Sequence, residues 1–96
     1  MKRFDLSRRA FDDLQDIWKF ISKDNSDAAD RVIDDLYRAM VQLADMPGMG
    51  HKREDLTSRA VLFWPVHSYL VVYTNSTPAQ IVRVVHGKRD LKQLLK

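Results

Sequence analysis

Apolar side chains recur every three or four residues through two stretches of the N-terminal half, which is the spacing of one face of an α-helix. The first stretch, residues 11–21, follows Ser7, whose side chain can cap a helix. The second, residues 29–44, follows KDNSD, where Asn25 or Ser26 can cap, and ends at MPGMG, because proline and two glycines do not continue a helix. Two helices joined by so short a linker predict an antiparallel hairpin.

Three β-rich runs follow in the C-terminal half, and a shorter one precedes the first helix. The runs AVLFW (60–64), YLVVY (69–73) and QIVRVVH (80–86) combine β-branched and aromatic residues, which favour strands. The linkers PVHS and TNSTPA between them have lengths compatible with hairpins. KRFDL (2–6) is a candidate first strand because its apolar residues alternate with polar ones.

The predicted order of elements is therefore β-α-α-β-β-β, followed by a short helix from Asp90 with Leu91, Leu94 and Leu95 turned inward. We expect an α+β fold in which the helical hairpin covers one face of an antiparallel-rich sheet. The other face of the sheet is left to solvent or to a partner. A length of 96 residues predicts a single domain, residues 1–96.

The net charge of +3 hides an uneven distribution. Residues 1–45 carry eight Lys or Arg against ten Asp, whereas residues 46–96 carry eight against three acidic residues. A C-terminal half this basic suits an acidic partner, either nucleic acid or an acidic protein segment. The alternative interpretation is that these basic residues only form an ordinary solvent-exposed surface.

The residue types present disfavour several classes of site. With no cysteine there is no disulfide framework and no thiolate zinc site. The three histidines fall in a connector, a turn and a strand end without i, i+4 spacing, so we predict no metal and no cofactor. There is no signal peptide and no apolar stretch approaches the length of a membrane span, so we expect a cytoplasmic protein with no membrane partner.

Three strand residues are candidates for binding or chemistry. Tyr69 and Tyr73 share one face of their strand, where they either line an open surface or belong to the core. Side chains of a β-strand point alternately to its two faces. In the last strand this predicts Arg83 on one face with Ile81 and Val85, and His86 on the opposite face. We expect Arg83 to mark the open face and to contact a phosphate or a carboxylate.

Four stretches together resemble one known family. They are FDDLQDIWKFI (11–21), LADMPGMG (43–50), FWPVHSYLVVY (63–73) and IVRVVHGKRDL (81–91). In order and spacing they are similar to the ParE/RelE superfamily of bacterial toxins from type II toxin–antitoxin modules, over nearly the whole chain. The resemblance implies one of two mechanisms. RelE-like members cut messenger RNA on the ribosome, whereas ParE-like members poison DNA gyrase.

RNA cleavage needs groups that activate the 2′-hydroxyl, stabilise the phosphorane and protonate the leaving group. RelE-like members supply lysines, arginines and a late tyrosine, and of that set only Arg89, in GKRD, has a match here. The expected tyrosine falls on Leu95, the expected strand arginine on Leu70, and the expected lysine pair on Val61 and Phe63. The resemblance therefore favours the ParE-like branch.

That branch implies a toxin that binds and poisons gyrase without being an enzyme. It also implies a ParD-like antitoxin with a DNA-binding domain and a disordered tail that folds on the toxin, giving a hetero-oligomer. The residues expected to contact the antitoxin or the target are Arg59, Tyr69, Tyr73, Arg83, Lys88 and Arg89.

Two alternatives stay open. A RelE-like ribonuclease would need an unusual site built on Arg83, His86 and Arg89, although a histidine at a strand end more often has a structural role. A non-toxic relic would bind its antitoxin and no cellular target.

Overall fold

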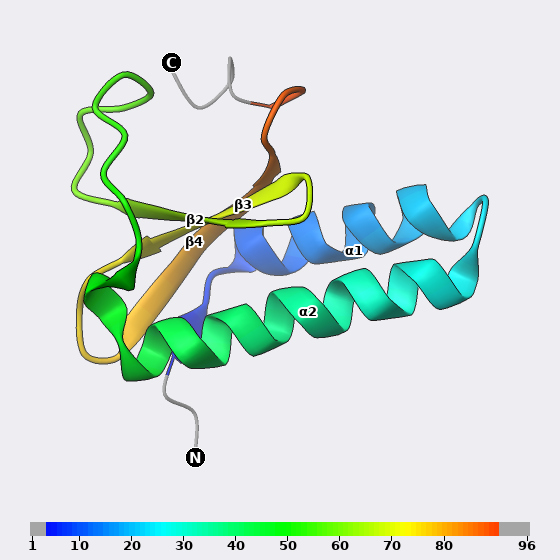
Figure 1. The fold of residues 1–96 in the computed structure, drawn as a ribbon, viewed down its shortest axis with the longest axis horizontal. Coiled ribbons are helices and arrows are strands. Elements are labelled where there is room, and N and C mark those ends of the chain that lie inside the picture. Colours follow the sequence, from blue (N-terminus) through cyan, green and yellow to red (C-terminus); the bar gives the residue numbers. More distant parts are fainter. Residues whose placement is uncertain (1–3, 91–96) are drawn as a thin grey trace.

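The computed structural model describes residues 4–90, which form a four-stranded sheet and two long helices (Figure 1). The elements are β1 (Phe4–Leu6), α1 (Arg8–Ser22), α2 (Ser26–Asp45), the short 3-10 helix η1 (Pro47–Met49), β2 (Leu62–Val66), β3 (Tyr69–Thr74) and β4 (Ala79–His86). The strand order is β1-β4-β3-β2, with β1 parallel to β4 and the other neighbours antiparallel. The predicted α+β fold and its order of elements are confirmed. The predicted C-terminal helix falls on residues 91–96, which lie outside the described residues.

Side chains at two of the predicted positions cap the helices. Ser7 Oγ accepts a hydrogen bond from the N–H of Ala10 at 3.0 Å, and Asn25 Oδ1 accepts one from the N–H of Ala28 at 2.9 Å. Each cap satisfies a backbone donor that the first turn of a helix leaves free. Because only residues 23–25 separate the two helices, α1 and α2 lie side by side in opposite directions (Figure 1).

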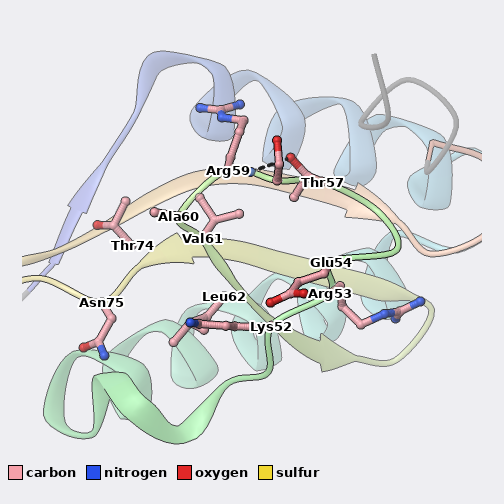
Figure 2. A pocket seen from close by; sticks show the side chains of 11 residues that line it. Lys52, Arg53, Glu54, Thr57, Arg59, Ala60, Val61, Leu62, Thr74 and Asn75 are labelled. Atoms are coloured by element: carbon pink, nitrogen blue, oxygen red, sulfur yellow. Dashed lines mark hydrogen bonds between the residues drawn. The ribbon is translucent and has the colours of Figure 1, made fainter.

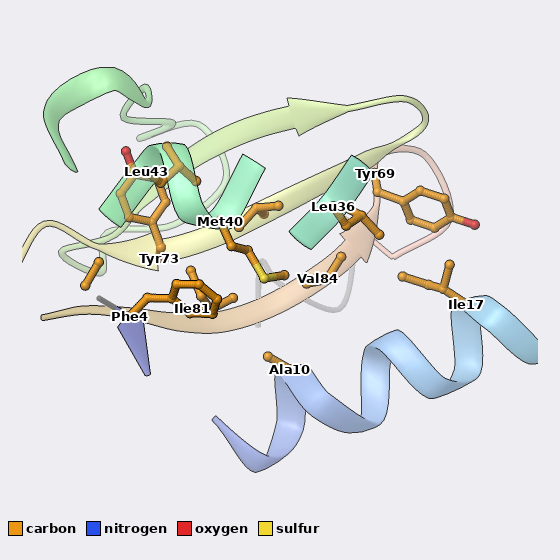
Figure 3. Packing of buried hydrophobic residues seen from close by; sticks show 12 residues of the cluster. Phe4, Ala10, Ile17, Leu36, Met40, Leu43, Tyr69, Tyr73, Ile81 and Val84 are labelled. Atoms are coloured by element: carbon orange, nitrogen blue, oxygen red, sulfur yellow. The ribbon is translucent and has the colours of Figure 1, made fainter. Parts of the chain in front are cut away.

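The main core lies between the helical hairpin and one face of the sheet (Figure 3). Its buried members are Phe4, Ala10, Ile17, Leu36, Met40, Leu43, Tyr69, Val71, Tyr73, Ala79, Ile81 and Val84. Burial of each large apolar side chain stabilises the fold by about 1.5–3 kcal/mol. Tyr69 and Tyr73 belong to this core, which decides between the two placements that their spacing allowed.

The opposite face of the sheet is covered by the chain's own connector between η1 and β2. Leu56 of this connector packs with Val61, Phe63, Val72 and Val85 in a second buried cluster. The expectation that this face is left to solvent or to a partner is therefore wrong where the cluster lies. The polar connector supplies Leu56 and, directly before β2, Val61 to this cluster.

The predicted alternation along β4 is broken between Ile81 and Arg83: Ile81 lies on the helix-covered face and Val82 on the opposite face, the reverse of the prediction, whereas Val84 and Val85 lie on their predicted faces. Two adjacent residues of β3 pair with Ile81 and Arg83, so Val82 is an extra residue in β4, that is, a β-bulge. Val84 consequently joins Ile81 in the main core, whereas Val85 packs in the second cluster. One inserted residue exchanges the faces of all the residues after it.

Tyr73 ties the sheet to the end of the helical hairpin. Its hydroxyl donates to the carbonyl oxygen of Pro47 at 2.6 Å and accepts from the N–H of Gly50 at 2.8 Å. A Cβ on Gly50 would lie 2.5 Å from that hydroxyl oxygen and 3.0 Å from the carbonyl oxygen of Phe63. This close approach requires glycine at position 50.

We predict that Gly50→Ala lowers the free energy of unfolding by about 1–3 kcal/mol, the usual cost of an added methyl group in a packed site. Gly48→Ala is the matched control, because a Cβ at Gly48 meets nothing within 4 Å. Urea denaturation of both variants measures the difference. Equal losses in the two variants would contradict the packing described for Tyr73.

A second prediction concerns alkaline pH. Burial raises the pKa of the Tyr69 and Tyr73 phenols above the ordinary value of 10.0. The folded state then holds these protons more tightly than the unfolded state, so the associated stability is complete below about pH 10 and is lost as the pH rises through the folded-state pKa. Urea melts at about pH 9 and about pH 11 should show a fall in stability that is smaller in Tyr73→Phe. An identical fall in that variant would contradict the assignment to Tyr73.

Candidate functional site

Arg83 of β4 is held by Asp13 of α1 instead of standing free on an open sheet face. Its Nε donates to Asp13 Oδ2 at 2.8 Å and its Nη2 donates to Asp13 Oδ1 at 3.2 Å. The two side chains are only 20% and 12% exposed. The hydrogen bond that Arg83 donates to Asp13 raises the pKa of Arg83 above its ordinary value. The predicted placement of Arg83 on an open face is wrong.

Asp13 also accepts a backbone hydrogen bond at the outer edge of β4, where no strand is paired. The short strand β1 ends opposite Ile81, so β4 has no strand partner on this side beyond that residue. The N–H of Val84 donates to Asp13 Oδ2 at 2.9 Å, and Ser7 Oγ donates to the carbonyl oxygen of Val82 at 2.8 Å. One carboxylate therefore satisfies a guanidinium and a strand amide, both with charge-assisted hydrogen bonds.

His86 is a satisfied histidine at the end of β4. Its Nδ1 accepts hydrogen bonds from the N–H groups of Lys88 and Arg89, each at 3.1 Å. The backbone N–H of His86 donates to Asp90 Oδ2 at 2.8 Å. The imidazole and the ring of Tyr69 form a T-shaped contact with 5.4 Å between their centroids. Because Nδ1 is an acceptor, the neutral imidazole carries its proton on Nε2. Nε2 is then a donor and has no lone pair for a general base.

Arg89 lies over the ring of Phe20 of α1, with its guanidinium carbon 4.6 Å from the ring centroid. It shares a hollow of about 540 Å³ with Arg83. The charged residues that line this hollow are Arg9, Arg83, Arg89, Asp12, Asp13, Asp16 and Asp90. Four carboxylates outnumber three guanidinium groups, so the hollow does not present the positive potential that would attract a phosphate chain.

The remaining predicted contact residues do not form one surface with Arg83 and Arg89. Tyr73 is fully buried and not available to a partner, whereas Tyr69 is almost fully buried but still lines a surface hollow. Lys88 lines a second hollow, of about 630 Å³, together with His86. Arg59 lines a third on the connector. The six residues expected to contact a partner are therefore divided among the core and three hollows, with Tyr69 and Lys88 together in the second.

The connector hollow is lined by three Lys or Arg residues, against two in the second hollow (Figure 2). It has a volume of about 680 Å³ and is lined by Lys52, Arg53 and Arg59 against the single acidic residue Glu54. Arg53 makes a bidentate contact with Asp55, at 3.0 Å for both hydrogen bonds. Figure 2 shows Arg59 and Lys52 on opposite sides of the hollow. The spread cations suit an extended acidic segment better than a single compact anion.

Sequence reasoning missed the exposed apolar side chains of the two helices. The large apolar residues that are exposed among residues 4–90 are Phe11, Trp18, Phe20, Tyr37, Val41 and Met46. Trp18 has the position of a core residue in the sequence pattern, yet its indole Nε1 donates to Asp30 of α2 at 2.8 Å near the surface. The signal for this exposure was the width of the apolar stripes, which is greater than one buried face requires.

Neither a metal site nor a membrane span is found in the part of the chain that the structure describes. No group of three or more metal-ligating side chains comes together in residues 4–90. Within the same residues, no helix has both the length and the apolar character that crossing a membrane demands.

Comparisons with known proteins define the class. Residues 4–91 match the family described as ParE toxin of type II toxin-antitoxin system, parDE. The chain is 30% identical over 94 residues to "Putative toxin Y4kP" of Sinorhizobium fredii. The aligned residues cover 98% of this chain and 97% of that protein. Its fold is similar to that of a chain in a solved structure, "Chromosomal ParDE TA system from P. aeruginosa", with a TM-score of 0.72, 16% identity and coverage of 86% and 92% of the two chains. The chain belongs to the ParE family of toxins from type II toxin–antitoxin systems.

The ion pair of Asp13 gives a direct prediction. Asp13→Ala should lower the free energy of unfolding by about 2–4 kcal/mol, because it leaves a partly buried guanidinium and a strand amide without their acceptor. Asp12→Ala is the matched control. Its carboxylate faces Arg8 across an exposed i, i+4 contact, and its loss should change stability by no more than about 0.5 kcal/mol. Urea denaturation compares the two, and similar small losses would contradict the role of Asp13.

Proposed function

We propose that this ParE-family toxin arrests growth by inhibiting DNA gyrase and that it is not a ribonuclease. The supporting observation is the engagement of Arg83, a residue of the candidate nuclease site, whose Nε and Nη2 both donate to Asp13. A guanidinium held in this way is not free to stabilise a phosphorane. The surrounding hollow has more carboxylates than guanidinium groups, and this also disfavours bound RNA.

The proton-transfer requirement points in the same direction. Cleavage through the 2′-hydroxyl needs a general base within reach of that hydroxyl. His86 Nδ1 is occupied by two backbone donors, which leaves Nε2 protonated in the neutral ring. Tyr69 lies in the core, and burial raises the pKa of its phenol, so its deprotonated form is disfavoured as a base near neutral pH.

We further propose that a cognate antitoxin of the ParD type neutralises the toxin in the cytoplasm by forming a hetero-oligomer with it. The antitoxin would combine a DNA-binding domain with a tail that folds on the toxin. An acidic part of that tail would meet the basic connector hollow of Lys52, Arg53 and Arg59. Because these cations are exposed, the contribution of this contact should decrease with rising ionic strength.

The test is induction of the toxin alone in a susceptible bacterium, with separate pulses of labelled thymidine and labelled methionine over the first minutes. We expect thymidine incorporation to stop first while methionine incorporation continues. A first effect on methionine incorporation would contradict the proposal and favour a RelE-like ribonuclease. Normal growth at a verified level of folded protein would identify a non-toxic relic.

A double variant at the end of β4 distinguishes a toxin that acts by binding gyrase from one that cleaves RNA. His86→Ala combined with Arg89→Ala should leave the protein toxic, because neither side chain performs proton transfer in the gyrase mechanism. A partial loss of toxicity without any change in messenger RNA would reflect Arg89 as a contact with the target. Loss of toxicity in a double variant that is folded by circular dichroism, together with protection of messenger RNA from cleavage, would show a ribonuclease. The growth-inhibition titre and a ribosome-dependent cleavage assay provide the two measurements.

A further inference from the structure

Charge is divided unevenly between the helices and the rest of the protein. Residues 8–45, which contain both long helices, carry six Lys or Arg against nine Asp. Residues 46–90 carry six Lys or Arg against three acidic residues. The helices cover one face of the sheet and the connector covers the other. The excess of carboxylates therefore lies on the helical side, and a polyanion is repelled there and attracted to the side of the connector.

Two of the hollows adjoin on the connector side of the sheet. Arg53 lines both the connector hollow and the second hollow. Val61, which lines the first, belongs to the buried cluster beneath the connector, and Leu70, which lines the second, packs against that cluster. Among the described lining residues of the two hollows, Glu54 is the one that is acidic. The Lys and Arg residues of the two hollows, which together we call the basic face, are Lys52, Arg53, Arg59 and Lys88.

Three of these four cations are not engaged by a carboxylate. Lys52, Arg59 and Lys88 are exposed and form no ion pair with any of residues 4–90. Arg53 donates two hydrogen bonds to Asp55, which leaves its other N–H groups for a further acceptor. An exposed cation without a partner is the kind of group that displaces condensed counterions from a nucleic-acid phosphate, and this release drives binding.

The uncharged polar lining of the connector hollow also suits phosphate oxygens. The side chains of Thr57, Ser58, Thr74 and Asn75 line this hollow beside the cations (Figure 2). Hydroxyl and amide groups of this kind donate hydrogen bonds to the phosphates of a duplex and position a protein on it without reading its sequence.

Side chains that could stack on unpaired bases are scarce in the described lining of the two hollows. Tyr69 is the one Phe, Trp or Tyr residue among them, and it is only 5% exposed. Proteins that hold single strands stack successive bases on accessible aromatic rings. The basic face therefore fits the backbone of a duplex, whose bases are already stacked on one another, better than it fits a single strand.

We propose that the basic face binds the phosphate backbone of double-stranded DNA without regard to sequence. The proposal rests on the proposed function, because the duplex in question is the one that gyrase holds, and it adds a direct contact between the toxin and that DNA. The acidic tail of the antitoxin is proposed to meet three of the same cations, Lys52, Arg53 and Arg59. Tail and DNA would then exclude each other from the basic face.

The number of cations limits the strength of this contact. If the three unpaired cations each neutralise one phosphate, the slope of log affinity against log salt concentration is about −2.7. Sequence-independent binding of this kind has a dissociation constant of about 10⁻⁴–10⁻⁶ M at physiological salt, so the free toxin binds DNA weakly. When gyrase holds both the toxin and the duplex, the contact becomes intramolecular, and an effective concentration of about a millimolar is enough to form it.

The first test compares two double variants that remove the same charge from opposite sides of the protein. Lys52→Gln with Lys88→Gln removes two cations of the basic face. Lys19→Gln with Lys23→Gln removes two exposed cations at the end of α1 and is the matched control. The probe is a short fluorescent DNA duplex of arbitrary sequence. Anisotropy measures its binding to each purified toxin at several salt concentrations, and circular dichroism verifies that each variant is folded.

We expect affinity for the duplex to fall about tenfold or more in the basic-face variant and to change less than about threefold in the control. The salt slope should become shallower by about 1.8 in the basic-face variant alone, because each lost phosphate contact removes about 0.9. Equal changes in the two variants would show a response to net charge only and would overturn the proposal. So would failure of the wild-type toxin to bind the duplex at low salt.

A second set of probes identifies the nucleic acid. Unlabelled single-stranded DNA and single-stranded RNA of the same length compete with the labelled duplex for the wild-type toxin. We expect both single strands to compete less well than unlabelled duplex DNA, because the basic face has no accessible stacking ring in its described lining. Stronger competition by single-stranded RNA would overturn the proposal and point to the substrate of a ribonuclease.

Toxicity assays separate failure of this proposal from failure of the proposed function. If both hold, thymidine incorporation stops first, and the basic-face variant is less toxic than the control variant. If gyrase is not the target, methionine incorporation stops first while the difference in duplex binding between the two variants persists, so the binding site stands and the proposed function fails. If thymidine incorporation stops first but the two variants bind the duplex equally, the proposed function stands and the DNA contact is overturned.

Discussion

The carboxylate of Asp13 is the contact on which the arrangement of helix and sheet depends. It lies on α1, yet it supplies the acceptor for a guanidinium and for a backbone amide of β4. The sheet needs such an acceptor because β1 is too short to pair with the full length of β4. A hydrophobic interface alone would hold α1 against the sheet without fixing its position along the strand, since apolar contacts are not directional. The ion pair fixes that position.

This constraint changes the meaning of the basic residues near the C-terminal end of β4. Arg83 serves the fold, Arg89 stacks on Phe20, and His86 organises the turn that follows its own strand. Their proximity resembles a catalytic cluster in the sequence, but each one is already engaged by a structural partner. These contacts hold the basic side chains at the end of the sheet in structural roles, and the proposed function takes this as its starting point.

Local signals predicted most of the fold. The caps at Ser7 and Asn25, the proline and glycines after α2, and the β-branched runs all depend on neighbouring residues, and the structure confirms them. The faces of Ile81 and Val82 could not be predicted, because the bulge at Val82 depends on pairing with β3 and leaves no distinctive residue behind.

Other features depend on contacts between distant parts of the chain. The covering of the second sheet face by Leu56 and the bond between Asp13 and β4 join residues that periodicity cannot relate. The paired aspartates at positions 12 and 13 look alike in the sequence as parts of a solvated helix face. Only the tertiary fold makes one of them structural and leaves the other exposed.

The most direct measurement is hydrogen exchange at the backbone amide of Val84, followed by NMR in the wild-type protein and in Asp13→Asn. The N–H of Val84 points away from β3 and toward Asp13, so only that carboxylate protects it. The account predicts slow exchange in the wild type, comparable to that of the paired amides of β3, and a selective acceleration at Val84 in the variant. Fast exchange at Val84 in the wild type would show that the edge of β4 is open, and Arg83 would then be available for a functional role.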